Sequence, residues 1–264
     1  MTWSTVSIEK RGRVAVVRFD RGDDRNALSR QVLHELMEAA RSFEEDLETS
    51  AVVLTGRPGV FTVGLDLKDA LAATADNPGL AERRQLSSLG QRMSRAWEEL
   101  APLTIVAIEG HCVGGGVALS VACDLRVCGA SARFLVPEIR RGMNMSWQSL
   151  PRITALVGPA RAKQLVILAQ PLAADVALAW GLAQEVAPDG GAFARAMEIA
   201  NEAAAMPPQA LRMIKQGINM AAMPLAHAVS YMDADQNALA RLSEDYDEGV
   251  RSFLDKRPPR FTGR

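Results

Sequence analysis

The sequence predicts an α/β fold that is followed by a helical C-terminal portion. Short apolar runs of strand length alternate with segments of helical period through the first half of the chain. Beyond residue 146 the apolar pattern is almost entirely helical. The chain has 264 residues, 48% of them apolar and 23% charged, which is enough to bury a sizeable core. An α/β core with additional C-terminal helices accounts for these observations together.

The expected strands are short runs rich in aliphatic residues and bounded by turn residues. The first two are joined by a turn at residues 10–13 and form a hairpin pattern. The third has three aliphatic residues at its centre, which is typical of a buried strand. The expected strands cover residues 5–8, 14–19, 51–55, 104–108, 125–128 and 132–135, with a late candidate at 182–186.

The expected helices begin with one that Ser29 can cap, since its hydroxyl can accept a hydrogen bond from the first turn. A long polar helix is expected over residues 80–100, after a connection at 71–79 that is rich in Ala, Asp, Asn and Pro. The later helices are expected at residues 146–156, 159–169, 174–180, 193–206, 209–220, 225–239 and about 247–256.

The most informative stretch runs from residue 108 to residue 124. A strand there leads through a turn into three consecutive glycines, Gly114, Gly115 and Gly116, after which a helix of small residues begins. A ligand can lie directly against a glycine backbone, and the first free N–H groups of the helix can stabilise a developing oxyanion. The alternative is a tight strand-to-helix turn that serves packing alone.

Composition excludes several functional classes. A net charge of -1 gives no reason to expect a nucleic-acid partner, and the apolar runs are too short to span a membrane. The N-terminus lacks the pattern of a signal peptide. Cys112, Cys123 and Cys128 are odd in number and lie in apolar surroundings, so we expect buried free thiols and a cytoplasmic protein. No metal site is expected, because the three histidines are far apart in the sequence.

Motifs in a fixed order cover nearly the whole chain and together identify a family. They are N-A-L-S at 26–29, F-T-V-G-L-D-L at 61–67, G-H-C-V-G-G-G at 110–116, A-C-D-L-R at 122–126, F-L-V-P-E-I at 134–139, L-A-A-D-V-A-L-A-W-G-L-A-Q-E-V at 172–186 and E-G-V-R-S-F-L-D-K-R-P-P-R-F at 248–261. In order and spacing they resemble the crotonase superfamily, also called the enoyl-CoA hydratase/isomerase family.

The resemblance implies the ClpP/crotonase-like fold of repeated ββα units, with a core at residues 1–195 and a helical oligomerisation region at 196–264. It implies a homo-oligomer, either a trimer or a dimer of trimers. It further implies an acyl-CoA thioester substrate whose carbonyl oxygen lies between two backbone N–H groups. By position these belong to Val63 and Gly115. Coenzyme A would be part of the substrate, and no other cofactor is implied.

The resemblance also implies residues that bind the coenzyme A portion. Asn26, Ala27 and Leu28 match a loop that lines the pantetheine and adenine. Near the C-terminus, two matching residues could reach the nucleotide of a neighbouring subunit, although a charged C-terminal helix is commonly just a solvated face. The full set of expected substrate-binding residues is Asn26, Ala27, Leu28, Asp66, Leu67, Gly114, Phe253 and Lys256.

One departure from the family pattern bears on the reaction. Hydratases of the family use two glutamates, whereas this chain keeps the second as Glu138 and has Ala118 at the position of the first. Hydration benefits from two positioned carboxyl groups, while one carboxylate can move a proton from C2 to C4. The sequence therefore favours isomerisation of 3-enoyl-CoA to 2-enoyl-CoA, with Glu138 as acid and base. In the alternative interpretation, Glu138 only caps a helix or pairs with Arg140 or Arg141.

Two other functions stay open. The first is a true enoyl-CoA hydratase in which Asn144 or a bound water takes the missing role. The second is a non-catalytic acyl-CoA-binding relative. A further departure is the bulk of Met143, Met145 and Trp147, which can narrow the pocket, although such residues are more often part of a core.

Overall fold

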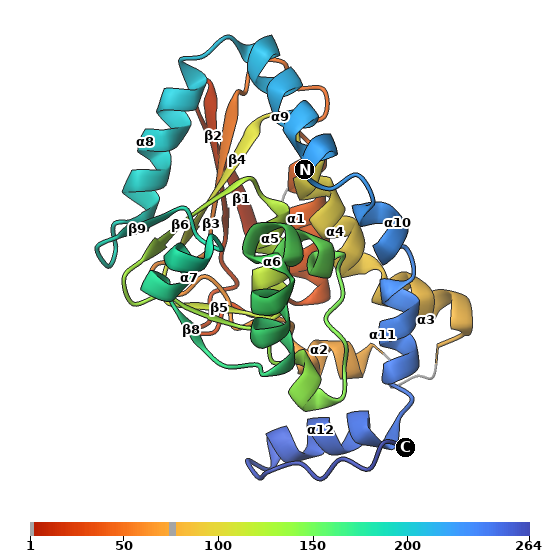
Figure 1. Cartoon of the computed structure of the whole chain (residues 1–264). Helices are drawn as coiled ribbons and strands as arrows, with labels where there is room; N and C mark the ends of the chain where they lie inside the picture. The colour runs from red at the N-terminus through yellow and green to blue at the C-terminus, as the bar shows by residue number, and fades with distance from the viewer. Residues whose placement is uncertain (1–2, 74–77) are drawn as a thin grey trace.

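A six-stranded sheet forms the centre of the computed structural model, which describes residues 3–73 and 78–264 (Figure 1). Its first two strands are antiparallel and the other pairs are parallel. In order across the sheet the strands are β1 (Val6–Arg11), β2 (Val14–Phe19), β3 (Ala51–Thr55), β4 (Leu103–Ile108), β6 (Leu125–Gly129) and β9 (Glu185–Ala187). A smaller sheet contains β5 (His111–Val113), β7 (Arg133–Leu135) and β8 (Leu172–Ala173).

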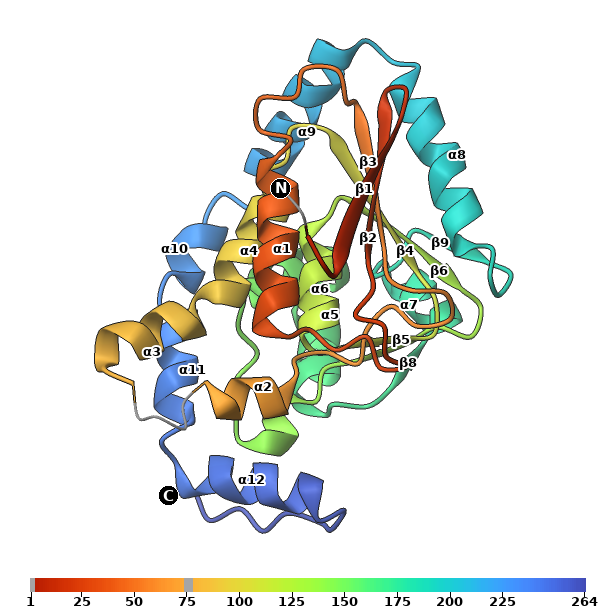
Figure 2. The ribbon, with the colours of Figure 1, turned by 180° about the vertical axis from the view of Figure 1, so that it is seen from behind.

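Helices cover both faces of the large sheet, as the two opposite views show (Figures 1 and 2). One face packs against α1 (Arg30–Arg41), α4 (Leu89–Glu98) and α5 (Gly115–Ala122), and the other packs against α8 (Ala192–Ala204). All five residues of β3 are buried because alternate side chains enter the two cores. The central strands therefore form near-continuous aliphatic runs in the sequence.

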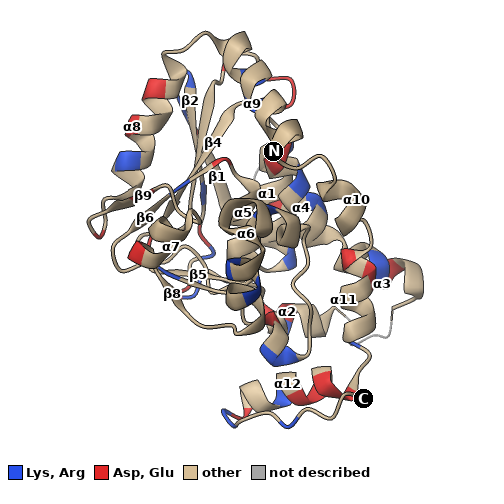
Figure 3. Ribbon diagram, in the orientation of Figure 1, with Lys and Arg blue, Asp and Glu red and all other residues tan. Residues whose placement is uncertain are grey.

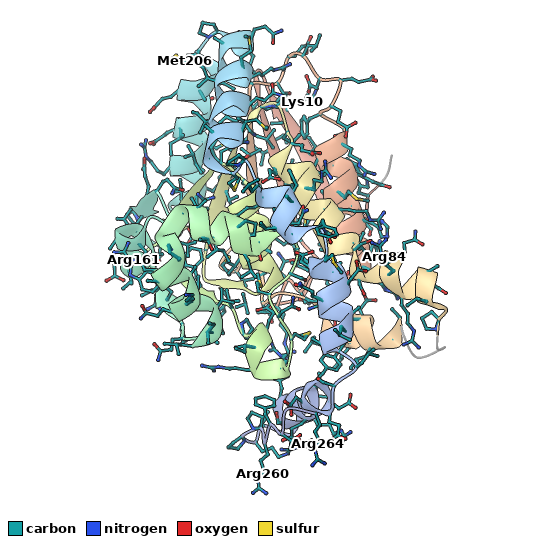
Figure 4. The ribbon with its side chains drawn as sticks, turned by 45° about the vertical axis from the view of Figure 1, so that its right-hand side comes forward. Lys10, Arg84, Arg161, Met206, Arg260 and Arg264 are labelled. Carbon is teal, nitrogen blue, oxygen red and sulfur yellow. The ribbon has the colours of Figure 1, made fainter. Side chains whose placement is uncertain are left out.

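The remaining helices extend from this core. They are α2 (Leu67–Ala72), α3 (Leu80–Ser87), α6 (Ser149–Ile167), α7 (Ala174–Trp180), α9 (Pro208–Ala222), α10 (Ala226–Ser230), α11 (Asp233–Ala240) and α12 (Glu244–Leu254), with a short 3₁₀ helix, η1 (Glu138–Arg141). Helix α12 packs against η1 at one end of the molecule. Arg260 and Arg264 mark that end, and Met206 marks the other (Figure 4). None of the described helices is both long and apolar enough to cross a membrane.

Most of the expected elements are confirmed, and the differences have local causes. The helix expected at 80–100 is two helices that meet at Ser88, and the one expected at 225–239 is also two. In α6 the helix is interrupted at Gly158, whose φ is 78°. Strands β5 and β8 were not expected, since runs of three and two residues give almost no periodic signal. Residues 74–77 of the expected connection lie outside the described part of the chain.

The division expected at residue 195 needs correction. It falls inside α8, where Ala196 and Ala200 are fully buried against the sheet. A break at that point would separate the two halves of one continuous packed helix. The core therefore extends through α8, and the helices that leave the sheet begin with α9.

Glu35 of α1 holds the start of β1 against the core through hydrogen bonds. Its carboxylate accepts backbone N–H groups from Ser4, Thr5 and Val6 at 2.8–3.2 Å, and the Thr5 hydroxyl at 2.7 Å. Burial alone would raise the pKa of Glu35, but these hydrogen bonds outweigh burial and lower the pKa to about 2. The ionised form therefore stabilises the native state.

We expect Glu35→Gln to lower the free energy of unfolding by about 2 kcal/mol at pH 7, the range for hydrogen bonds to a charged acceptor. Because the folded pKa lies below the ordinary 4.5, this contribution is complete above pH 4.5 and is lost as pH falls toward 2. Denaturant unfolding at several pH values measures it. Glu45→Gln, which removes an exposed carboxylate, is the control. A constant difference between wild type and Glu35→Gln from pH 7 to pH 2 would contradict the assignment.

Candidate active site

Two loops that are far apart in the sequence run side by side at one edge of the fold. The N–H of Leu28 donates to the oxygen of Gly64 at 2.8 Å, and the N–H of Asp66 donates to the oxygen of Leu28 at 3.0 Å. The N–H of Val63 donates to the oxygen of Arg25 at 3.1 Å. These bonds join residues 25–28 to residues 63–66 as a short parallel pair.

The conformation of Gly64 determines which amide of this loop is free. In a regular strand the N–H groups of Val63 and Leu65 would point the same way. Gly64 has a φ of 91°, which breaks the alternation, so that Asp66 rather than Leu65 donates back to the neighbouring loop. Within the described residues, the N–H of Leu65 has no hydrogen-bond partner.

The expectation that Val63 supplies an oxyanion donor was therefore wrong. Its N–H is already used by Arg25, and the free donor of this loop belongs to Leu65, two residues further on. The sequence motif marks the loop correctly. The positive φ of Gly64, which turns the next amide around, cannot be deduced from the motif alone.

The second free amide belongs to Gly115, the first residue of α5. Thr62 pairs in parallel with Cys112, and Leu65 and Gly115 each follow three residues later. A Cβ atom placed on Gly64 would lie 3.7 Å from the backbone nitrogen of Gly115, so the two loops are in close contact. Because Gly115 begins the helix, its N–H has no intrahelical acceptor and carries the positive end of the helix dipole.

Each glycine of the triplet is required by a different neighbour. A Cβ atom on Gly114 would lie 2.4 Å from Oε1 of Glu138, and one on Gly115 would lie 2.5 Å from the ring of Trp147. On Gly116 it would lie 2.3 Å from the methyl group of Thr62. Packing thus explains all three glycines, and it also places a carboxyl group and an indole ring against the helix start.

Glu138 reaches this position through the small sheet. β5 and β7 are parallel, and the N–H of Gly114 extends their pairing by donating to Leu135 at 2.8 Å. The chain then turns at Pro137 into η1, which directs the carboxyl group of Glu138 at Gly114. Glu138 therefore lies beside the free amide of Gly115.

The carboxyl group of Glu138 is enclosed, and one of its two oxygens lacks a partner. Its Oε2 atom is buried and makes no hydrogen bond within the described part of the chain. Burial raises the pKa of Glu138 to about 7, and a hydrogen bond from its own backbone N–H and the nearby positive charge of Arg141 offset this only partly. The alternative of an ion pair with Arg140 or Arg141 is not what this structure contains, since no such pair occurs among its described residues.

A small buried residue stands where hydratases of the family have their first glutamate. Ala118 is fully buried in α5, one turn after Gly114. Asn144, which was considered as a substitute, lies against α11, where the amide of Asn237 donates to its Oδ1 at 3.2 Å and to its backbone oxygen at 3.1 Å. Glu138 is therefore the acid that contacts the glycine triplet.

Two residues expected to bind coenzyme A have structural partners. Asn26 is fully buried, and its side chain forms hydrogen bonds with the backbone of Phe19, Arg21 and Phe61, so it shapes the loop. Asp66 caps α2 and pairs with Arg21. Burial alone would raise the pKa of Asp66, but the hydrogen bond from Arg21 and the capping hydrogen bonds from Asp69 and Lys68 lower it.

The other expected binding residues are divided between two regions. Ala27 and Leu28 are buried next to the glycine triplet, and Leu67 begins α2. Phe253 and Lys256 lie at the end of α12, where both are exposed and the guanidinium of Arg141 is 4.3 Å from the centre of the Phe253 ring. Ala27, Leu28 and Gly114 are thus brought together. Figure 1 shows α12, which carries Phe253, at one end of the molecule and apart from α5.

Other candidate chemistry is limited. Cys112, Cys123 and Cys128 are buried free thiols, as expected, and burial raises the pKa of each. Across residues 3–73 and 78–264, no group of three or more His, Cys, Asp or Glu side chains could hold a metal ion. The chemistry of the site is that of backbone amides and one carboxyl group.

Known proteins resemble this chain over its full length. A family model described as enoyl-CoA hydratase/isomerase matches residues 9–264. The short-chain-enoyl-CoA hydratase of Clostridium acetobutylicum is 31% identical over 258 residues, which cover 97% of each chain. The crotonyl-CoA hydratase of Syntrophomonas wolfei is 28% identical and covers 100% of both chains.

Solved structures agree with these matches. Carnitinyl-CoA hydratase from Mycobacterium avium has a TM-score of 0.86 at 29% identity, with 100% of both chains covered. An enoyl-CoA hydratase/isomerase from Pseudoalteromonas atlantica has a TM-score of 0.87 at 26% identity, with 98% of this chain and 100% of that chain covered.

We expect Glu138→Gln to stabilise the protein at alkaline pH. A folded pKa of about 7, above the ordinary 4.5, means that stability falls as pH rises through this interval, because the native state resists ionisation. The variant should gain on the order of 3 kcal/mol at pH 8 and nothing at pH 4. Thermal midpoints at a series of pH values measure the effect, with Glu244→Gln as an exposed control. Equal midpoints for wild type and Glu138→Gln at pH 8 would show that the carboxyl group is not enclosed.

Proposed function

Because the chain belongs to the enoyl-CoA hydratase/isomerase family, we propose that it moves the double bond of an enoyl-CoA thioester from position 3 to position 2. The observation that carries this proposal is the lone enclosed carboxyl group of Glu138 beside the free amide of Gly115. One such group suffices for a reaction that removes and returns a single proton.

The thioester oxygen would lie between the N–H groups of Leu65 and Gly115. When a proton leaves C2, negative charge moves to this oxygen, and two preorganised donors stabilise the resulting enolate by several kcal/mol. Both donors are main-chain groups whose positions the paired loops fix. Neither needs to reorganise as charge develops.

Glu138 would act first as base and then as acid. Its carboxylate takes a proton from C2 of the 3-enoyl thioester, and the electron pair of that C–H bond delocalises to form a dienolate. The protonated Glu138 returns the proton to C4, the double bond settles between C2 and C3, and the carbonyl reforms. A pKa of about 7 suits both roles, since at neutral pH the carboxylate can take the proton from C2 and then release it at C4 without a large difference in free energy between its two forms.

A true hydratase is the second candidate, and the names of the relatives favour it. Those of Clostridium acetobutylicum and Syntrophomonas wolfei are both named hydratases. Hydration would require another group to position water, because Ala118 supplies none and Asn144 already accepts hydrogen bonds from Asn237. The geometry therefore supports isomerisation better.

The coenzyme A portion would lie along the paired loops. Ala27, Leu28, Asp66 and Leu67 remain the proposed residues beside it, with Gly114 beneath the thioester. Phe253 and Lys256 would act on a neighbouring subunit. We propose no cofactor besides the coenzyme A of the substrate, no nucleic-acid partner, and a cytoplasmic location.

We expect the wild-type protein to convert trans-3-hexenoyl-CoA to trans-2-hexenoyl-CoA faster than it hydrates the latter. The value of kcat/KM for isomerisation should rise with pH and level off above about pH 7, because the base must be ionised to accept a proton. Glu138→Gln should lose about 10³-fold in kcat. Absorbance of the conjugated thioester follows both reactions.

Fast hydration by wild type that Glu138→Gln abolishes would replace the isomerase proposal with the hydratase. Calorimetric binding of hexanoyl-CoA without turnover of either substrate would instead support the non-catalytic relative. The control variant Glu244→Gln, at an exposed position at the start of α12, should keep wild-type rates.

We also propose that the chain forms a trimer or a dimer of trimers through its C-terminal helices. These helices expose an unusual number of large apolar side chains, and α10 carries no Lys, Arg, Asp or Glu (Figure 3). Many exposed large apolar side chains on neighbouring helices are typical of a protein interface. The exposed apolar residues of α9 and α10 with the segments that follow them are Met213, Ile214, Ile218, Met220, Leu225, Val229, Tyr231 and Met232.

Ile214 and Ile218 lie one turn apart on α9 and are 62% and 61% exposed in the single chain. We expect the double variant Ile214→Glu/Ile218→Glu to reduce the native mass to that of a monomer, because each glutamate would have to be buried in the interface. Light scattering after size-exclusion chromatography measures the mass. Leu80→Glu, at an exposed apolar position on α3, should leave it unchanged. A wild-type monomer would contradict the proposal.

A further inference from the structure

Trp147 covers the middle glycine of the triplet. A Cβ atom on Gly115 would lie 2.5 Å from Cη2 and Cζ3 of the indole and 3.2 Å from Cδ1 of Leu28. The tip of the ring therefore rests on the glycine backbone, next to the free amide of Gly115. An acyl group whose carbonyl oxygen accepts a hydrogen bond from this amide would therefore lie near Trp147, Leu28 and the carboxyl group of Glu138.

The other edge of the ring packs against α4. A Cβ atom on Gly90 would lie only 1.9 Å from Cε2 and 2.2 Å from Nε1 of Trp147. The indole is thus wedged between the backbones of two helices, α4 and α5, and each has a glycine at the point of contact. A change of rotamer would take the indole out of the slot between Gly90 and Gly115.

The backbone of Trp147 is fixed as firmly as its side chain. Trp147 and Gln148 both have left-handed conformations, with φ of 61° and 56°, which are uncommon for bulky residues. The guanidinium of Arg152 donates to both of their carbonyl oxygens, at 3.0 and 3.1 Å. The N–H of Gln148 donates to the buried carboxylate of Asp233 at 2.5 Å.

A buried ion pair holds Arg152 in turn. Its guanidinium donates twice to the carboxylate of Glu98 on α4, at 2.9 and 2.8 Å, and its side chain is only 2% exposed. A bidentate pair of this geometry resists displacement. Three elements, α4, α6 and α11, therefore converge to keep an unfavourable backbone conformation in place.

We infer that Trp147 determines substrate specificity by limiting the length of the acyl chain. This inference rests on the proposed function, since it concerns the same site. The indole occupies the space over Gly115 into which a longer chain would extend, and its fixed backbone keeps it there. A strained conformation maintained by buried ionic contacts beside a reactive group is typical of functional pre-organisation.

The first test compares chain lengths in wild type and Trp147→Ala. The substrates are trans-3-hexenoyl-CoA and trans-3-decenoyl-CoA, and the readout is the ratio of their kcat/KM values. Removal of the indole should raise the ratio of decenoyl to hexenoyl at least tenfold. Trp180→Ala, at another partly buried tryptophan that lies on α7, should leave the ratio unchanged.

Binding supplies a readout that does not require turnover. Calorimetry with hexanoyl-CoA and decanoyl-CoA should show a matching change of preference in Trp147→Ala. Trp147→Phe, which keeps a ring in the slot, should give an intermediate change and guards against loss of folding in the alanine variant. If both the ratio of kcat/KM values and the ratio of binding constants change by less than twofold in Trp147→Ala while acyl-CoA binding is intact, the role of Trp147 is refuted and the proposed function stands. No binding of either thioester by wild type would overturn the proposed function itself.

A second test examines the packing directly. Gly90→Ala should lower the thermal midpoint of wild type, because the new methyl group would collide with the indole. In the Trp147→Ala background the same change should raise the midpoint, since alanine is the better helix former. The same shift in both backgrounds would show that Trp147 does not occupy the slot.

Discussion

The contact between the carboxyl group of Glu138 and the backbone of Gly114 is the constraint on which the rest of the site depends. Any side chain at Gly114 would displace the carboxyl group, because a Cβ atom there would lie 2.4 Å from Oε1. Burial, with Oε2 left without a hydrogen-bond partner among the described residues, raises the pKa of Glu138 to about 7. A solvated glutamate would be too weak a base to remove a proton from carbon. The enclosure against Gly114 therefore both positions the carboxyl group and raises its basicity.

The surrounding fold serves to keep that contact in place. The small sheet aligns β5 with β7, and α12 packs on η1, where Gly142 and Gly249 allow the two backbones to approach closely. On the other side, the paired loops leave the amide of Leu65 free near that of Gly115. An enclosed carboxyl group and left-handed residues lower stability locally, and buried contacts such as the Glu98 and Arg152 pair offset that cost.

The sequence predicts the fold and the elements of the site well, because both depend on local patterns. Apolar runs revealed the central strands, and the motif order revealed the crotonase-like fold, which the family match and the solved structures confirm. The Pro and Glu after the short strand β7 identified Glu138, and the structure places it against the glycines. The prediction that the N–H of Val63 is an oxyanion donor was wrong, because the positive φ of Gly64 leaves the N–H of Leu65 free instead. The position of Trp147 also depends on long-range contacts with α4 and α11 that no local pattern contains.

The vibrational frequency of a bound thioester carbonyl tests most directly whether two backbone amides polarise it beside Glu138. Infrared difference spectra of hexanoyl-CoA labelled with ¹³C at C1 would be recorded free and bound to the protein. We expect the carbonyl band to shift to lower frequency on binding, because two hydrogen bonds from Leu65 and Gly115 weaken the C=O bond. A bound thioester whose carbonyl band stays at its position in water would contradict the proposed oxyanion site.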